Sequence, residues 1–158
     1  MEKPGTTQRV NLEGDNMKNV LFVCTGNTCR SPMAQGICEK MAYDNDLPIS
    51  CKSAGLSAAK GHPVSANAVI VCKEIGVDIS RYRTTNVREL DLSKFDAIFT
   101  MSMRHKHALI ALGANPYKIW LLGAETGGIS DPYGGDEDTY RRCRDEIYDA
   151  INDSIKEI

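Results

Sequence analysis

The sequence predicts a single α/β domain with a four-stranded parallel sheet and helices on both of its faces. Its 158 residues suit one domain with a substantial core. Hydrophobic residues make up 42% and charged residues 25% of the chain, as in an ordinary globular protein. Short apolar runs alternate with helical patterns, which indicates βαβ units and a parallel sheet. We expect any ligand to bind beyond the carboxyl ends of the strands.

Four apolar runs predict the strands. The first run, Asn19–Cys24, is continuous and rich in valine, as expected of a strand that is buried on both faces. The other three runs are Ile49–Ala54, Phe95–Met101 and Lys118–Leu122. Cys24 therefore stands at the carboxyl end of the first strand.

Four helical patterns separate and follow these strands. Ser31-Pro32 opens the first helix, because Ser is favoured at the N-cap and Pro at the first helical position. The later helices are predicted over Pro63–Ile75, Arg104–Leu112 and Thr139–Ile158. Apolar residues recur at helical spacing and predict three buried faces. These faces are Ala34, Ile37, Cys38, Met41 and Ala42; Ala66, Val69, Ile70 and Cys72 or Lys73; and Tyr140, Cys143, Ile147, Ile151 and Ile155.

The N-terminal segment, residues 1–16, is polar and has no apolar stretch typical of a secretory signal. We expect a flexible tail or an expression leftover, with Met17 a candidate for the native start and the folded domain over residues 17–158. The six cysteines are too sparse for a secreted disulfide scaffold. We therefore expect a reducing cytoplasm.

The charge balance and the length of the apolar runs each argue against one class of partner. Lys and Arg total 19 against 21 Asp and Glu, a formal net charge of −2, so there is no basic excess to hold a nucleic acid. The longest apolar run, around Val20–Val23, is far too short to cross a bilayer. We expect no nucleic-acid and no membrane partner.

The segment that links the first strand to the first helix reads C-x5-R-S, from Cys24 through Arg30 to Ser31. Five intervening residues let successive backbone N–H groups turn inward around a tetrahedral oxyanion, and the helix adds its positive end. Arg30 can grip two phosphate oxygens at once. The same donors stabilise a thiolate at Cys24, and the Ser31 hydroxyl can hydrogen-bond that thiolate. The alternative is a core cysteine beside a surface arginine.

The run VLFVCTGNTCRSPMA resembles the signature of the low-molecular-weight protein tyrosine phosphatase family. The resemblance extends to Ser53-Ala54-Gly55 and to Asp131-Pro132-Tyr133, and so covers about residues 18–158. It implies a cysteine-dependent protein phosphatase that forms a phosphocysteine intermediate, with Cys24 as nucleophile and Arg30 as transition-state clamp. It also implies that Asn27 holds a strained loop and that Asp131 is the general acid. Within the loop, the implied phosphate- and substrate-binding residues are Thr25, Gly26, Asn27, Thr28, Cys29 and Ser31, with Tyr133 outside it.

Asp131 also has a chemical argument of its own. The leaving atom must be protonated as its bond to phosphorus breaks, and the water that attacks phosphocysteine must then lose a proton. One carboxyl group can do both, and Asp131 lies in a glycine-rich segment that suits an adjustable catalytic loop. Taken alone, Asp131-Pro132 is more typical of the start of a turn than of a catalytic site. The catalytic interpretation rests on the loop at Cys24.

The remaining cysteines and histidines have simpler interpretations. Within the family resemblance, Cys29 could trap oxidised Cys24 as a disulfide, and a small packing residue is an equal alternative. Neither metal nor cofactor is expected, because no Cys or His cluster has zinc-site spacing. Core positions are expected for Cys38, Cys51, Cys72 and Cys143. Surface or cap positions are expected for His62, His105 and His107, and a solvated helix face for Arg141, Arg142 and Arg144.

Three other functions compete with a protein phosphatase. The arsenate reductases that share this loop need two further cysteines close together downstream, and none lies between Cys72 and Cys143. A cysteine phosphocarrier would have no use for Arg30 and Asp131, which both serve turnover. A catalytically dead phosphate-binding module is separated from an enzyme only by assay.

Thr28 distinguishes two kinds of substrate within the family. Tyrosine-directed members usually carry a bulky aliphatic residue at this position and often an aromatic residue in the loop after the second strand, which here is Leu56–Gly61. Thr28 together with Asp-Pro-Tyr-Gly-Gly resembles the bacterial protein arginine phosphatases. A smaller polar side chain leaves room for a guanidinium, which Asp131 could hold before protonating it. We therefore favour phosphoarginine in a protein substrate, with phosphotyrosine as the alternative, and we expect a monomer.

Overall fold

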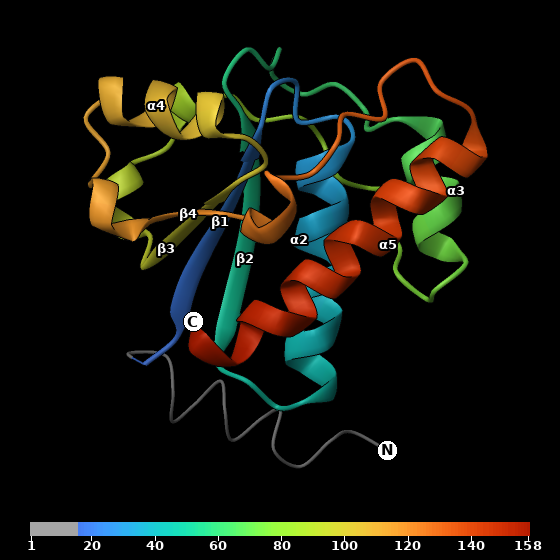
Figure 1. Cartoon of the computed structure of the whole chain (residues 1–158), viewed down its shortest axis with the longest axis horizontal. Coiled ribbons are helices and arrows are strands. Elements are labelled where there is room, and N and C mark those ends of the chain that lie inside the picture. The colour runs from blue at the N-terminus through green and yellow to red at the C-terminus, as the bar shows by residue number, and fades with distance from the viewer. Residues whose placement is uncertain (1–15) are drawn as a thin grey trace.

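Four parallel strands lie side by side in the order β2-β1-β3-β4 in the computed structural model, which describes residues 16–158 (Figure 1). The predicted fold class is confirmed. The predicted third and fourth strands are too long at their ends. Phe95 still belongs to a turn, in which its N–H donates to Leu92 O, and the Met101 carbonyl accepts from Ile129 N instead of a strand neighbour. The strands are β1 (Lys18–Cys24), β2 (Ile49–Gly55), β3 (Ala97–Thr100) and β4 (Ile119–Leu121).

Helices cover both faces of this sheet, with α2, α3 and α5 on one side and α4 on the other (Figure 1). The α-helices are α2 (Arg30–Asp44), α3 (Ala66–Lys73), α4 (Met103–Ala111) and α5 (Glu137–Ser154). Short 3₁₀ helices are η1 (Val87–Glu89), η2 (Leu92–Lys94), η3 (Pro116–Lys118), η4 (Ala124–Thr126) and η5 (Ile155–Glu157).

The central strand β1 explains why its sequence is apolar throughout. Val20 and Phe22 pack into the core on the side of α2 and α5, whereas Leu21 and Val23 pack into the core on the side of α4. Side chains alternate between the two faces of a strand, so a strand covered on both sides must be apolar at every position. Phe22 stacks on Phe99 of β3 with 5.6 Å between ring centroids.

The start of α2 differs from the prediction. The helix begins at Arg30, and Ser31 lies in its first turn rather than at the cap, because the Ser31 hydroxyl turns toward Cys24. The predicted buried face of this helix, which includes Ile37 and Met41, is confirmed.

The predicted face of α3 is confirmed at Cys72 and in part at Val69, which is half-buried, and is wrong at Ala66 and Ile70. The helix buries Ala68, Val71 and Cys72, whereas Ile70 is 42% exposed. The backbone N–H of Ser65 donates to Thr28 O, which fixes the start of the helix beside the loop and turns this other face toward α5.

The last helix begins two residues earlier than predicted because Asp136 caps it, with its carboxylate accepting from Thr139 N at 2.9 Å. Its predicted buried side, from Tyr140 to Ile155, is confirmed. No helix within residues 16–158 is long and apolar enough to cross a membrane. The tail predicted over residues 1–16 lies, except for Asn16, outside the described residues.

Candidate active site

Cys24 ends β1 at the centre of the sheet, and two hydrogen-bond donors converge on its sulfur. The Asn27 N–H donates to Cys24 Sγ at 3.3 Å, and Ser31 Oγ lies 2.9 Å from the same atom. Since the Asn27 side-chain amide already donates to Ser31 Oγ at 2.8 Å, the Ser31 hydrogen can go to Cys24 Sγ or to Ala54 O, and the sulfur, at 2.9 Å against 3.4 Å, is the nearer acceptor. The nucleophilic form of cysteine is the thiolate, whose sulfur can accept hydrogen bonds from both donors.

Asn27 holds an unusual backbone conformation in the middle of this loop. Its φ of 58° lies in the left-handed region, and the residue is only 2% exposed. Its side-chain NH₂ group also donates to Ser53 Oγ at 3.0 Å, and its side-chain oxygen, Oδ1, accepts from Thr85 N at 2.9 Å. The Asn27 side chain therefore connects the loop to β2, through Ser53, and to the segment that contains Thr85.

Gly55, at the end of β2, leaves room for the loop. A Cβ atom at this position would lie 2.6 Å from Thr25 O and 2.8 Å from Asn27 N, which are backbone atoms that cannot move aside. Glycine is thus required here by close approach rather than by a turn.

The loop has backbone donors to offer to an anion. Among the described residues, the N–H groups of Thr25, Gly26, Thr28 and Cys29 donate to no protein atom. They stand at the N-terminus of α2, where the helix dipole favours negative charge. Thr25 is exposed and Gly26 and Thr28 are half-buried, so an oxyanion can reach this loop and accept hydrogen bonds from these N–H groups.

Arg30 and Asp131 meet beside the loop, although 101 positions separate them in the sequence. The Arg30 guanidinium is buried and donates to Ile129 O at 2.9 Å. Its other nitrogen lies 3.6 Å from Asp131 Oδ2, and the Asp131 side chain is 55% exposed. Arg30 therefore anchors the segment after β4 and holds a solvent-accessible carboxylate at the edge of the loop.

Thr28 and Cys29 belong to the loop, and Tyr133 lies next to Asp131, whose carboxylate accepts from the Tyr133 N–H at 3.1 Å. Thr28 is half-buried, with its hydroxyl oxygen 3.6 Å from Cys29 Sγ. Cys29 Sγ lies 3.2 Å from the Tyr140 hydroxyl, and burial together with this contact raises the pKa of Tyr140 to about 12. Tyr133 is 80% exposed, so its ring is free to contact a substrate.

His105 is a site residue for which a surface or cap position is predicted; its backbone N–H donates to the N-cap Ser102 of α4, but its side chain is not at the surface. It is only 4% exposed, and its Nε2 lies 2.9 Å from the Thr25 hydroxyl oxygen. Burial, with the charges of Arg30 and Arg104 nearby, lowers the pKa of His105 to about 4, so the ring is neutral at pH 7. Its Nδ1 is buried without a hydrogen-bond partner in the described part of the chain. The spacing from His105 to Leu109, one helical turn, is the signal that could have indicated a buried face.

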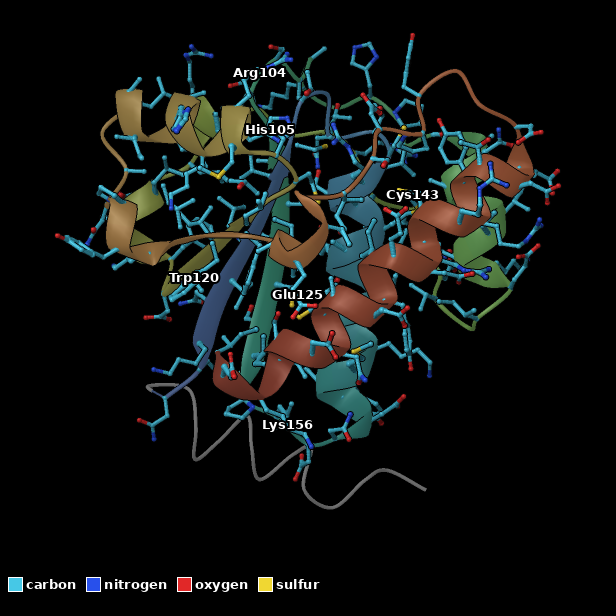
Figure 2. The ribbon with its side chains drawn as sticks, in the orientation of Figure 1. Arg104, His105, Trp120, Glu125, Cys143 and Lys156 are labelled. Carbon is cyan, nitrogen blue, oxygen red and sulfur yellow. The ribbon has the colours of Figure 1, made fainter. Side chains whose placement is uncertain are left out.

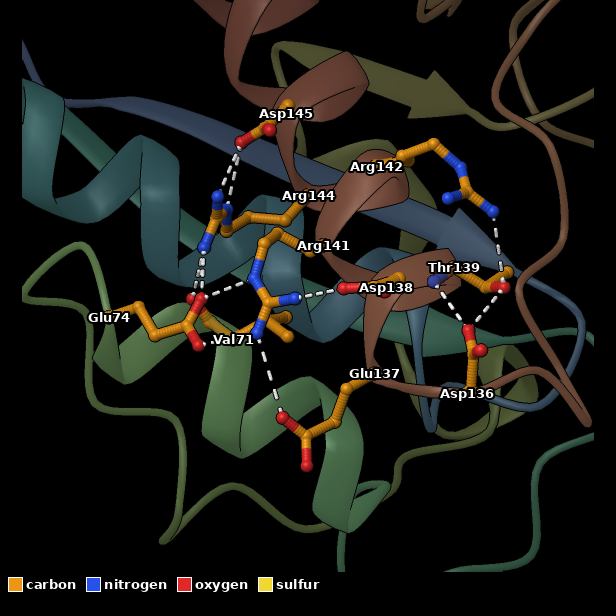
Figure 3. Close-up of polar contacts among 10 residues, drawn as sticks. All are labelled: Val71, Glu74, Asp136, Glu137, Asp138, Thr139, Arg141, Arg142, Arg144 and Asp145. Atoms are coloured by element: carbon orange, nitrogen blue, oxygen red, sulfur yellow. Dashed lines mark hydrogen bonds and ion pairs between the residues drawn. The ribbon is translucent and has the colours of Figure 1, made fainter.

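The arginines of α5 do not form the solvated face that was predicted. Arg144 is buried and donates to Val71 O and to Glu74, both at 2.8 Å (Figure 3). Arg141 is half-buried and binds Glu74 with two nitrogens, and only Arg142 is exposed. Hydrogen bonds from Arg141 and then Arg144 lower the pKa of Glu74 to about 2. These arginines join α5 to α3.

The other predicted positions agree with the structure. Core positions are confirmed for Cys38, Cys51, Cys72 and Cys143, and His62 and His107 are exposed as expected. Residues 16–158 contain no group of three or more His, Cys, Asp or Glu side chains arranged to hold a metal ion.

Residues 19–158 match the family model described as low molecular weight phosphotyrosine protein phosphatase. A protein-arginine-phosphatase of Geobacillus stearothermophilus is 34% identical over 140 residues, which are 84% of this chain and 90% of that protein. The low molecular weight protein-tyrosine-phosphatase PtpB of Staphylococcus haemolyticus is 37% identical over 81% of this chain and 91% of its own length. An arsenate reductase of Halalkalibacterium halodurans is 36% identical over 84% of this chain and 91% of that protein.

The fold also matches solved structures. The crystal structure of the low molecular weight protein tyrosine phosphatase from T. tengcongensis superposes with a TM-score of 0.85 and 38% sequence identity, covering 89% of this chain and 99% of that chain. The strand order, the loop after β1 and the match to the family model all indicate the same family. The chain therefore belongs to the low-molecular-weight protein tyrosine phosphatase family and is a cysteine-dependent phosphatase.

Proposed function

We propose that this enzyme removes phosphate from phosphoarginine in proteins through a phosphocysteine intermediate. Cys24 is the nucleophile, Arg30 binds the phosphoryl oxygens and Asp131 is the general acid and base. The contacts around Cys24 and the arrangement of Arg30 beside Asp131 support these roles. The proposal also places the enzyme in a reducing cytoplasm, since none of its six cysteines is paired.

The first chemical step transfers the phosphoryl group to sulfur. The Cys24 thiolate attacks phosphorus while the bond from phosphorus to the guanidinium nitrogen breaks, and Asp131 gives its proton to that nitrogen. The free loop N–H groups and Arg30 take up the charge of the equatorial oxygens. The product of this step is an S–P bond at Cys24 and a free arginine side chain.

The second step returns the enzyme to its starting state. Water attacks the phosphocysteine, and the Asp131 carboxylate accepts the proton that the water loses. The S–P bond breaks and inorganic phosphate leaves. The Ser31 hydroxyl, 2.9 Å from Cys24 Sγ, stabilises the departing thiolate.

Thr28 is the observation that carries the preference for phosphoarginine. Its side chain is half-buried in the loop that begins at Cys24, and its backbone carbonyl accepts from Ser65 N at 2.8 Å, which fixes the residue in place. A hydroxyl there offers a hydrogen bond to a polar, planar guanidinium, whereas a branched aliphatic side chain would grip an aromatic ring. The names of two relatives, both protein-arginine-phosphatases, support the same choice.

Two other activities occur among the relatives. A protein tyrosine phosphatase would use the same three catalytic residues, and the exposed ring of Tyr133 can stack on either substrate. An arsenate reductase would need an accessible relay of thiols. Cys72 and Cys143 are both buried in helices, and no cysteine lies between them in the sequence, which argues against that activity.

The test compares kcat/KM for a phosphoarginine protein and a phosphotyrosine peptide in three variants of one residue. Wild type is expected to prefer phosphoarginine, and Thr28→Ile is expected to shift the ratio toward phosphotyrosine by about 10- to 200-fold. Thr28→Val is the matched variant, because it keeps the shape and removes only the hydroxyl. Thr28→Ser keeps the hydroxyl and should retain the wild-type preference. If wild type prefers phosphotyrosine and Thr28→Ile leaves the ratio unchanged, the phosphoarginine assignment is wrong.

A further inference from the structure

A groove of about 650 Å³ lies between α5 and the β3–β4 side of the sheet. Lys18, at one end of β1, lines the groove and lies about 20 Å from Cys24, which ends the same strand, at 3.3 Å per residue. Ile129 also lines the groove, and its backbone carbonyl accepts a hydrogen bond from Arg30 of the active site. Trp120 and Glu125 lie on the β4 side of this groove (Figure 2).

The floor of the groove is apolar and its β4 side is aromatic. Phe99, Leu121, Ile129 and Ala150 contribute to the lining. Trp120 also lines the groove and is 57% exposed, although an indole ring is normally among the most buried side chains. An apolar groove with an accessible tryptophan is typical of a protein-binding surface.

Carboxylates surround this apolar floor. Along α5, Glu146, Asp149 and Asp153 follow one another at helical spacing on the groove side. None of the three forms an ion pair with another described residue, although their helix carries several paired acids elsewhere. The full set of acidic lining residues is Asp96, Glu125, Glu146, Asp149, Asp153 and Glu157, against a single lining lysine, Lys18.

We propose that this groove docks a basic segment of a partner protein, with arginine side chains flanking an aliphatic anchor. The carboxylates attract the guanidinium groups, the Trp120 ring stacks on one of them, and the apolar floor takes the aliphatic side chain. An acidic or phosphorylated segment is disfavoured, because six carboxylates would face it across a groove with one lysine. None of the three catalytic residues, Cys24, Arg30 and Asp131, lines this groove.

Trp120 supplies a direct measurement, because it is the only tryptophan in the sequence. The probe is an unphosphorylated peptide of alternating Arg and Leu without aromatic residues, titrated into the full chain while tryptophan emission is recorded. We expect a saturable change in emission that weakens with salt, and none with a peptide that carries Gln in place of Arg. Absence of a saturable change overturns the proposal.

Charge-neutralising variants locate the site. Asp149→Asn with Asp153→Asn should weaken binding of the peptide by about 3- to 10-fold, as expected for two exposed charge pairs. The control, Asp138→Asn with Asp145→Asn, removes the same number of charges from α5 outside the groove lining, where they pair with Arg141 and Arg144, and should leave affinity unchanged. Both double variants should keep wild-type kcat/KM on an aryl phosphate. Equal weakening in the two double variants would mean non-specific attraction and would overturn the proposal.

Two other occupants of the groove give distinct results. If only a chain without residues 1–15 binds the peptide, the N-terminal segment occupies the groove and the proposal is wrong. If tryptophan emission instead changes with protein concentration in the absence of peptide, the occupant is a second copy, which also overturns the proposal.

Discussion

Replacing Asn27 should damage both the stability of the fold and the reactivity of Cys24. Asn27→Ala removes three side-chain hydrogen bonds of 2.8–3.0 Å, to Ser31, Ser53 and the backbone of Thr85. It also forces alanine into the left-handed backbone conformation of this position, φ 58°, which is unfavourable for alanine. Three lost bonds and this strain together predict a decrease of about 2–4 kcal/mol in the free energy of unfolding, allowing for non-additivity.

The effect on catalysis follows from the Ser31 hydroxyl. Without the Asn27 amide, this hydroxyl loses the donor that orients its hydrogen toward Cys24 Sγ. A hydrogen bond to a charged group contributes about 1.5–3 kcal/mol, which corresponds to a fall in kcat/KM of roughly 10- to 100-fold. Urea unfolding measures the stability, and hydrolysis of an aryl phosphate measures kcat/KM.

Two matched variants separate the contributions. Asn27→Gly loses the same hydrogen bonds but tolerates positive φ, so it should be more stable than Asn27→Ala by about 1 kcal/mol. Asn115→Ala removes one exposed side-chain hydrogen bond, to Tyr117 N, and should leave kcat/KM unchanged. The reasoning is refuted if Asn27→Ala behaves like Asn115→Ala in both assays.

Three further predictions concern other residues of the site. Asp131→Asn should slow substrates with poor leaving groups far more than activated ones, and an equal loss across leaving groups of different pKa would indicate a structural role. Peroxide should inactivate the enzyme reversibly through a Cys24–Cys29 disulfide detected by peptide mapping; recovery of Cys29→Ser to the wild-type level would show that Cys29 is only a packing residue. His105→Ala should lower kcat/KM by about 3- to 10-fold through loss of the Thr25 contact, and His105→Gln should restore most of it. The folded pKa of His105 is about 4, below its ordinary 6.5, so protonation of this residue in the unfolded chain should lower the stability of the fold as pH falls from 6.5 to 4. Thermal unfolding of His105→Gln should lack this loss of stability at low pH, and identical pH profiles of the two proteins would contradict the burial argument.

The features that were predictable from sequence are those encoded by neighbouring residues. Strand β1 was evident because both of its faces are buried, so apolar side chains run without interruption to Cys24. The phosphate loop was evident because the chemistry needs Cys24 and Arg30 at a fixed spacing along one short segment. The buried side of α5 was evident from several helical turns of consistent spacing.

The features that escaped prediction depend on contacts between distant segments. His105 meets Thr25 across 80 positions, and Arg144 meets Glu74 across 70, so no local pattern marks either as buried. Helix α3 has only eight residues with apolar side chains on several sides. Its face is decided by packing against α5 rather than by its own periodicity, which explains the wrong assignment of Ile70.

The central claim is that Cys24 carries the phosphoryl group during turnover. The most direct measurement mixes the enzyme with a phosphoarginine protein, quenches the reaction rapidly without acid, and identifies the phosphorylated residue of the enzyme by peptide mapping. The account predicts a phosphoryl group on the Cys24 peptide in wild type, and neither adduct nor turnover in Cys24→Ala, with Cys143→Ala as a control that retains both. A phosphoryl group on any other residue, or full turnover by Cys24→Ala, would contradict the mechanism.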